Sequence, residues 1–180
     1  DVPGDRPEPV RAGQPAAAYR AAQCLLKAEP ERAQRLLEHS ATGGNPAAQE
    51  TLGRACIEGA GIDAACAKKW LQPAAAQGRA SAMSVLAWLY AREGTPESLS
   101  QASKLYRAAA EAGDVAAQNN LGELFETGRG VSREPALALG WYRKGAENGF
   151  APAQFNLARL LAFGIGTERD ATAARAWATK

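Results

Sequence analysis

The sequence is poor in the residues that most enzymes use for covalent or metal chemistry. Among 180 residues there are one histidine (His39), three cysteines and one methionine. A nucleophile–histidine mechanism needs an imidazole beside the nucleophile, and a zinc site needs His, Cys or carboxylate ligands at short spacings. The sequence offers neither pattern, and it has no phosphate-binding loop of the G-x-x-x-x-G-K type. We therefore expect no catalytic residue, no metal ion and no cofactor.

Long hydrophobic runs and clusters of one charge are also missing. No run of eighteen apolar residues occurs, so the sequence predicts no membrane-spanning helix. The net charge is +2 and the basic residues are interleaved with acidic ones, which is not the pattern of a nucleic-acid-binding surface. Aromatic residues make up 7% of the chain and hydrophobic residues 46%. Alanine therefore carries much of the apolar content, and alanine favours helix.

What the sequence does contain is a repeated pattern. A bulky apolar residue is followed 16 residues later by a leucine four times: Leu36 and Leu52, Trp70 and Leu86, Leu105 and Leu121, and Trp141 and Leu157. An alanine precedes each of these leucines by four residues, so the pair shares one helix face. Another alanine precedes each bulky residue by three: Ala33, Ala67, Ala102, Ala138 and, before Trp177, Ala174. Such fixed spacings are typical of stacked helical hairpins.

The repeats divide the chain into hairpin units. Residues 1–14 are rich in proline and charge and are expected to form a flexible lead-in. Residues 15–180 are expected to form one repeat domain. Its units are predicted at about 16–43, 44–77, 78–112, 113–148 and 149–180, the last one incomplete. The sequence begins at Asp1 without a methionine, which favours a processed or trimmed product.

The best-formed unit carries three motifs in order, and they identify a family. They are A-x-x-x-L-G at 117–122, G-x-G-V at 128–131 and W-Y-x-K-x-A at 141–146. This series resembles the Sel1-like repeat family, a relative of the tetratricopeptide repeats. The resemblance implies an all-α, right-handed α-solenoid of about five antiparallel helix hairpins. It also implies use as an adaptor in protein complexes, often in bacterial envelopes.

The resemblance further suggests where a partner would bind. In the related tetratricopeptide repeats the first helix of each hairpin lines the concave side. First-helix positions outside the core columns give a predicted set of partner-binding residues: Arg54, Trp88, Asn119, Glu123, Phe155 and Arg159. Exposed aromatic and arginine side chains often anchor interfaces. The alternative is that Trp88 and Phe155 simply pack against neighbouring hairpins.

The cysteines bear on cellular location. Cys56 and Cys66 fall on opposite helices of one predicted hairpin, so they are within reach of a disulfide. They could equally be reduced thiols that act as small hydrophobic side chains, and Cys24 is left over in either case. A bridge would indicate an oxidising compartment. We expect a periplasmic or otherwise exported protein, with the cytoplasm as the alternative.

Together these features predict a non-catalytic protein-interaction module. It could be an adaptor or scaffold, or an immunity-type inhibitor that neutralises a toxin. Some cysteine-rich relatives of the family are associated with binding or cleaving β-lactams. Here, however, Ser100 and Ser103 do not have the S-x-x-K spacing to Lys104, so we expect no enzyme. The identity of the partner and the oligomeric state stay open.

Overall fold

The computed structural model describes residues 15–58 and 61–180, and the regular secondary structure of this part of the chain is all helix, without a strand. The predicted flexible segment 1–14 and two residues of the first predicted glycine loop, Gly59 and Ala60, lie outside the described residues. The helices are α1 (Pro15–Leu25), α2 (Pro30–Thr42), α3 (Pro46–Glu58), α4 (Ala64–Ala76), α5 (Ala80–Glu93), α6 (Pro96–Glu111), α7 (Val115–Thr127), α8 (Pro135–Glu147), α9 (Ala151–Phe163) and α10 (Ala171–Ala178).

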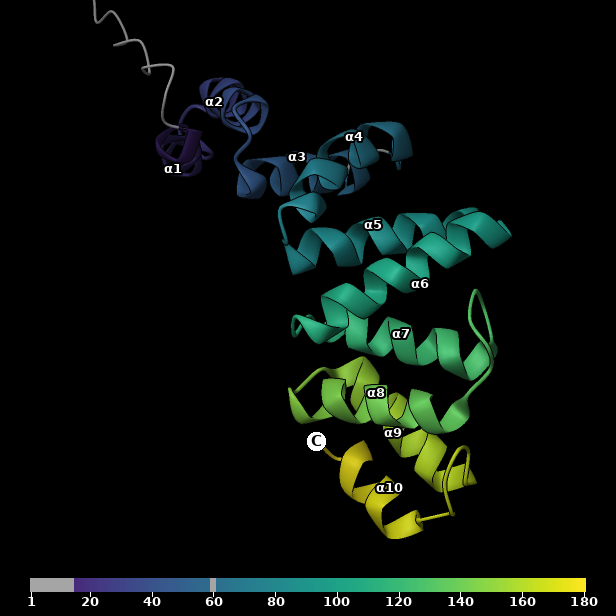
Figure 1. Ribbon diagram of the computed structural model, residues 1–180. Coiled ribbons are helices and arrows are strands. Elements are labelled where there is room, and N and C mark those ends of the chain that lie inside the picture. The colour runs from purple at the N-terminus through teal and green to yellow at the C-terminus, as the bar shows by residue number, and fades with distance from the viewer. Residues whose placement is uncertain (1–14, 59–60) are drawn as a thin grey trace, which may run out of the picture. The chain divides into compact units, whose positions relative to one another are not determined.

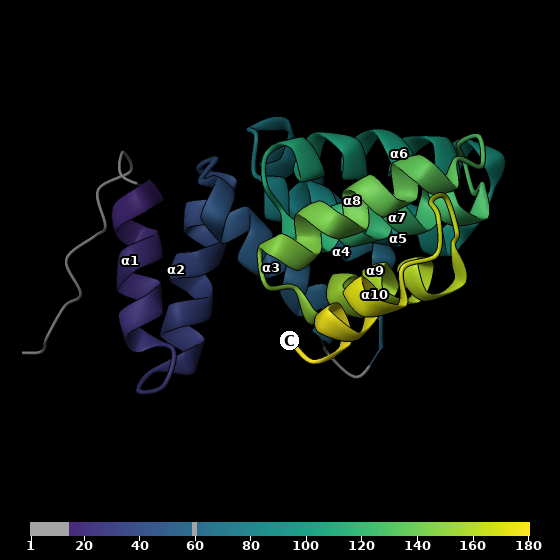
Figure 2. The same cartoon turned by 90° about the horizontal axis from the view of Figure 1, so that it is seen from below.

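Successive helices form antiparallel pairs, and the pairs fall into two compact units (Figures 1 and 2). The first unit, residues 1–77, holds the pairs α1–α2 and α3–α4, with α2 packed against α3. The second unit, residues 78–180, holds α5–α6, α7–α8 and α9–α10, stacked in chain order. The predicted fold class, an all-α solenoid of helix hairpins, is confirmed.

Small residues allow the paired helices to approach closely. The alanines of the second helices are all buried, as the repeat pattern predicts: Ala33, Ala67, Ala102, Ala138 and Ala174. Gly122 on α7 lies against the ring of Tyr142 on α8, where a β-carbon would come within 2.8 Å of Cε1. Gly53 on α3 lies in the same way against Leu71 on α4. Close helix contact of this kind needs a small side chain opposite a large one.

The large core residues of the second helices are not the ones that the 16-residue spacing singles out. Leu36, Trp70, Leu105, Trp141 and Trp177 are only partly buried. The fully buried large residues come one position later, at Leu37, Leu71, Tyr106 and Tyr142. One residue is a rotation of about 100° around a helix. The later position faces the first helices directly, whereas the tryptophans pack at the edge of the core.

Glutamine side chains connect successive hairpins within each unit. One residue after the core alanine of a first helix, a glutamine amide donates to a carbonyl of the preceding second helix. The bonds run from Gln49 to Ala41, from Gln118 to Ala110 and from Gln154 to Ala146, at 3.0, 3.2 and 3.3 Å. Each bond satisfies a carbonyl at a helix end. The same connection therefore recurs within both units.

The third hairpin has a short loop in place of the G-x-G loop. Only Gly94 and Thr95 separate the end of α5 from the start of α6. Gly94 ends α5 in the left-handed conformation with φ 71°, and Thr95 caps α6 by accepting a hydrogen bond from the Ser98 amide. Pro96 then opens the helix at a favoured position. The sequence Gly94-Thr95-Pro96 thus ends one helix and begins the next within three residues.

Candidate functional site

The second unit brings together five of the six predicted partner-binding residues, and the sixth, Arg54, belongs to the first unit. Trp88, Glu123 and Arg159 occupy the same repeat position on α5, α7 and α9. We call the surface of α5, α7 and α9 that carries these three residues, together with Phe155 one turn before Arg159, the first-helix face. Arg54 holds the equivalent position on α3 and forms a 3.1 Å ion pair with Glu50.

The prediction for Asn119 is corrected by its burial. Its side chain lies between α7 and α9, and the residue is only 8% exposed. The side-chain oxygen Oδ1 of Asn119 accepts a 3.0 Å hydrogen bond from the side-chain amide Nδ2 of Asn156. Asn119 thus joins two successive hairpins and is not open to a partner. Its position is off the apolar column of its own hairpin, but it faces the first helix of the next one.

The two aromatic residues of the predicted set behave differently. Trp88 is partly buried and packs against the core, and the guanidinium of Arg92 lies 4.9 Å above its ring. Phe155 is 67% exposed. Trp88 therefore has a structural role in addition to any binding role. Phe155 holds the repeat position of Asn119, which α9 covers, but no later first helix covers Phe155 in the described part of the chain.

Phe155 lies beside a groove between α9 and α10. The groove has a volume of about 610 Å³ and its lining is mainly apolar, with alanines from both helices and a second phenylalanine, Phe163, which is 73% exposed. Three arginines, Arg159, Arg169 and Arg175, also line it. Large exposed aromatic side chains beside arginines are the composition of an interface centre.

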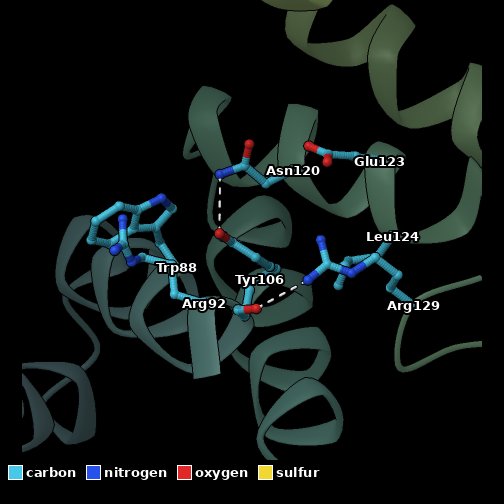
Figure 3. A pocket seen from close by; sticks show the side chains of 8 residues that line it. Trp88, Arg92, Tyr106, Asn120, Glu123, Leu124 and Arg129 are labelled. Carbon is cyan, nitrogen blue, oxygen red and sulfur yellow. Dashed lines mark hydrogen bonds between the residues drawn. The ribbon is translucent and has the colours of Figure 1, made fainter. Parts of the chain in front are cut away.

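A second, smaller hollow lies between α5, α6 and α7, and we call it the Tyr106 pocket (Figure 3). Its volume is about 310 Å³. Six polar or aromatic residues line it: Trp88, Arg92, Tyr106, Asn120, Glu123 and Arg129. The Asn120 amide donates a 3.2 Å hydrogen bond to the Tyr106 hydroxyl at the back of the pocket. Burial raises the pKa of Tyr106 above its ordinary value of 10.0, so the hydroxyl keeps its proton.

The position of Arg129 in the Tyr106 pocket is set by the loop between α7 and α8. Gly128 and Gly130 on either side of it both have left-handed backbone angles, with φ 75° and 72°. Gly130 lies so close to α6 that a β-carbon would come within 2.6 Å of the Leu99 carbonyl oxygen. One Nη of Arg129 then donates a 3.1 Å hydrogen bond to the Ala91 carbonyl. The G-R-G turn therefore directs the guanidinium into the pocket (Figure 3).

Next along the first-helix face, a carboxylate joins three helices. Glu126 on α7 accepts a 2.9 Å hydrogen bond from the Tyr142 hydroxyl on α8 and a 2.6 Å hydrogen bond from Arg159 on α9. The hydrogen bond from Arg159 holds the pKa of Glu126 below its ordinary value of 4.5. Burial and the Glu126 charge both raise the pKa of Tyr142. The three side chains form one hydrogen-bonded cluster that ties α9 to the preceding hairpin.

The structure links Cys56 and Cys66 by a disulfide between α3 and α4, with 5.9 Å between their Cα atoms. Cys24 on α1 is an exposed free thiol. His39 on α2 is exposed as well. Among residues 15–58 and 61–180, no group of three or more His, Cys, Asp and Glu side chains is placed to hold a metal ion.

None of the helices in the described part of the chain is both long enough and apolar enough to span a bilayer.

Sequence reasoning missed the polar residues of the second unit that line the Tyr106 pocket and form the Glu126 cluster. Tyr106 and Tyr142 stand beside the bulky residues of the 16-residue spacing, and Arg129 lies inside a loop whose glycines indicate only a turn. A comparison of the repeats with one another could have pointed to Arg129. The middle residue of the G-x-G loop is Ala60, Arg129 or Ile165, and only one of these is charged.

Comparisons with known proteins identify the repeats. The family model of the Sel1 repeat matches residues 46–78, 80–114, 115–150 and 151–180. Among solved structures, the chain is similar to c5321, a protective antigen of uropathogenic Escherichia coli strains that displays an SLR fold. The TM-score is 0.86, the identity is 34%, and the match covers 92% of this chain and 37% of that one.

A second similar structure is a Sel1 repeat protein from Oxalobacter formigenes. The TM-score is 0.84 and the identity is 32%, over 94% of this chain and 70% of that one. A comparison with curated proteins gave no match.

Proposed function

Because this chain belongs to the Sel1 repeat family, we propose that it is a non-catalytic module that binds a partner protein through the first-helix face of its second unit. Sel1 repeat proteins generally mediate interactions between proteins. Repeat folds of this kind present extended surfaces in place of enclosed catalytic sites. The chain spans 37% of the length of c5321. The proposal that it binds a partner therefore rests on these repeats alone, and nothing about the whole of c5321 is carried over to it.

The observation that carries the proposal is the exposure of Phe155 and Phe163 on α9. Both side chains are more than two-thirds exposed, and they flank an apolar groove with arginines at its rim. Contiguous exposed apolar surface with a polar rim is characteristic of interaction sites. A partner that covered the groove would bury aromatic anchors beside guanidinium groups, which is the arrangement that contributes most to binding free energy in protein interfaces.

The experiment is affinity capture from the source organism with the intact chain as bait. Phe155→Asp removes the exposed aromatic group from the first-helix face. Leu137→Asp on α8 is the matched control, because Leu137 is also a large exposed hydrophobic residue, at 44%, but lies on a second helix. We expect capture to be lost with Phe155→Asp and kept with Leu137→Asp. Equal capture by both variants would contradict the proposal.

We also propose that the protein acts in an oxidising compartment of a bacterial cell, such as the periplasm, as an adaptor, scaffold or inhibitor. The Cys56–Cys66 disulfide supports this location, because structural disulfides persist in such compartments and are rare in the cytosol. Fractionation of the source cells, followed by detection of the natural chain, tests it. Recovery in the cytosolic fraction with three reduced cysteines would contradict this part of the proposal.

A further inference from the structure

The Tyr106 pocket occupies the place where the next repeat holds its buried carboxylate. Glu126 comes nine residues after the core alanine Ala117 of α7, and the residue nine after Ala82 of α5 is Ala91. Ala91 lines the Tyr106 pocket. At this position, therefore, one hairpin has a carboxylate and the hairpin before it has a methyl group with open space beside it.

The hydroxyl that binds the carboxylate is present in both hairpins. Tyr142 comes four residues after Ala138, and Tyr106 comes four after Ala102. The Tyr142 hydroxyl donates a hydrogen bond to Glu126. Tyr106 is buried to a similar degree and lines the pocket. Its hydroxyl oxygen accepts a hydrogen bond from Asn120, so its own proton is still available to an acceptor in the pocket. The donor is retained although the chain's own acceptor is replaced by alanine.

The positive charge is retained too, but it comes from a different place. In the later hairpin Arg159 on the next first helix binds Glu126 at 2.6 Å, and the equivalent residue at the Tyr106 pocket is Glu123. The cations here are Arg129, held by the G-R-G loop, and Arg92, stacked on Trp88. Figure 3 shows Arg129 on one side of Tyr106, with its hydrogen bond to the Ala91 carbonyl, and Arg92 and Trp88 on the other side.

We propose that the Tyr106 pocket binds one carboxylate group from an acidic side chain of the partner protein, held by the Tyr106 hydroxyl and the Arg129 guanidinium. The ligand carboxylate takes the place that Glu126 fills within the next hairpin. Hydrogen bonds between ionised groups are about twice as strong as those between neutral ones. Glu123 at the rim opposes a second negative charge, so the pocket selects a single acidic residue over an acidic run.

This inference deepens the proposed function, since it names the chemistry that a partner must present to the first-helix face. It stands apart from the α9–α10 groove, because no residue of the Tyr106 pocket lines that groove. The proposal for the pocket and the proposal for the groove can therefore be disproved independently. Loss of capture in Phe155→Asp concerns the groove, whereas the measurements below concern the pocket alone.

The first test fills the pocket from within the chain. Ala91→Glu places a carboxylate at the position of Glu126, with Ala91→Gln as the neutral control. If the pocket is a carboxylate site, Ala91→Glu has a higher urea midpoint than Ala91→Gln at pH 7, and the difference disappears in an Arg129→Gln background. Equal midpoints for the Glu and Gln variants, or a difference that survives Arg129→Gln, would overturn the proposal.

The second test uses a peptide with a single carboxylate, acetyl-Ala-Ala-Glu-Ala-Ala-amide, and its glutamine counterpart as control. Binding to the full chain is followed by NMR at the Trp88 indole N–H and the Arg129 Nε–H. We expect saturable shifts with the glutamate peptide only. Arg129→Gln should weaken binding by about tenfold, which corresponds to one charge-assisted hydrogen bond, and Glu123→Gln should strengthen it. No saturable shift, or equal affinity for both peptides, would refute the proposal.

Discussion

Gly122 on α7 is in direct contact with the ring of Tyr142 on α8, and the two residues set how closely the helices of this hairpin approach. A β-carbon at position 122 would lie 2.8 Å from Cε1 of Tyr142 and 2.9 Å from Cδ1. Tyr142 is almost fully buried, so its ring cannot move aside without displacing neighbours. The same ring carries the hydroxyl that binds Glu126.

We therefore predict that Gly122→Ala destabilises the protein by about 1–3 kcal/mol, the usual cost of adding a methyl group to a packed core. Gly140→Ala on α8 is the matched control, because a β-carbon at position 140 would meet no atom of another element within 4 Å. That change should stabilise the helix by about 0.5–1 kcal/mol. Urea unfolding followed by circular dichroism measures both. Similar midpoints for the two variants would show that the contact is not tight.

The Glu126 cluster predicts a pH dependence of stability. The pKa of Glu126 is lowered in the folded state by its hydrogen bond from Arg159. Its contribution is therefore fully present above the ordinary value of 4.5 and is lost as the pH falls through the lower folded value. Glu126→Gln removes this contribution. We expect the wild type to be more stable than the variant at pH 7, by no more than about 1 kcal/mol because the pair is partly exposed.

The measurement for this cluster is the urea midpoint of wild type and Glu126→Gln at pH 7 and at pH 3. The difference between them should shrink at the lower pH. Glu147→Gln, at an exposed position of α8, serves as the control for a charge change on the same hairpin. A difference between wild type and Glu126→Gln that stays constant from pH 7 to pH 3 would contradict the prediction.

The disulfide predicts a local effect of reduction. The bridge closes a loop with a sequence separation of 10 residues between Cys56 and Cys66. The chain-entropy estimate for a loop of this size is about 2–3 kcal/mol. Reduction, or the double change Cys56→Ala and Cys66→Ala, should destabilise the first unit and leave the α5–α10 unit largely unaffected. Amide hydrogen exchange resolved by residue measures this.

A labelling experiment checks the pairing itself. Alkylation of the unreduced protein, followed by mass spectrometry, should modify Cys24 alone, since it is exposed and free. Three modified cysteines would rule out the bridge. A Cys24→Ser variant should then show no labelling before reduction and two labels after it.

The proposal that the module is non-catalytic is also testable. The serines nearest to Lys104 belong to α6, where the Ser103 hydroxyl donates a 2.9 Å hydrogen bond to the Ser100 carbonyl and Ser103 itself is buried. We predict no turnover of the β-lactam nitrocefin above the buffer rate. Turnover that persists through purification, and that is lost in Ser100→Ala or Ser103→Ala, would show that the chain is an enzyme.

The parts of the fold that could be predicted are those set by periodicity. The spacing of Leu52, Leu86, Leu121 and Leu157 indicates which helix face is buried, and each of these leucines is buried in the structure. The glutamine contacts between hairpins follow the same period at Gln49, Gln118 and Gln154, whereas the third hairpin has Met83 there. Period and residue size are enough here because each hairpin packs only on its neighbours.

Which helix covers a given position could not be predicted in the same way. Asn119 is polar and off the apolar column of its own hairpin, and yet α9 covers it. The column of Tyr106 and Tyr142 was missed because the 16-residue spacing singles out the residues just before them, Leu105 and Trp141. The Tyr106 pocket becomes apparent only when two hairpins are compared. Ala91 suggests a ligand site because Glu126 holds the same position in the next hairpin.

The central claim is that a partner protein contacts the first-helix face of the second unit. Site-specific photocrosslinking in the source cells tests it most directly, with p-benzoylphenylalanine placed at Phe155 on α9 or, as the control, at Leu137 on α8. We predict a discrete higher-mass adduct from position 155 and none from position 137. Adducts of equal yield from both positions, or an adduct from position 137 alone, would contradict the account.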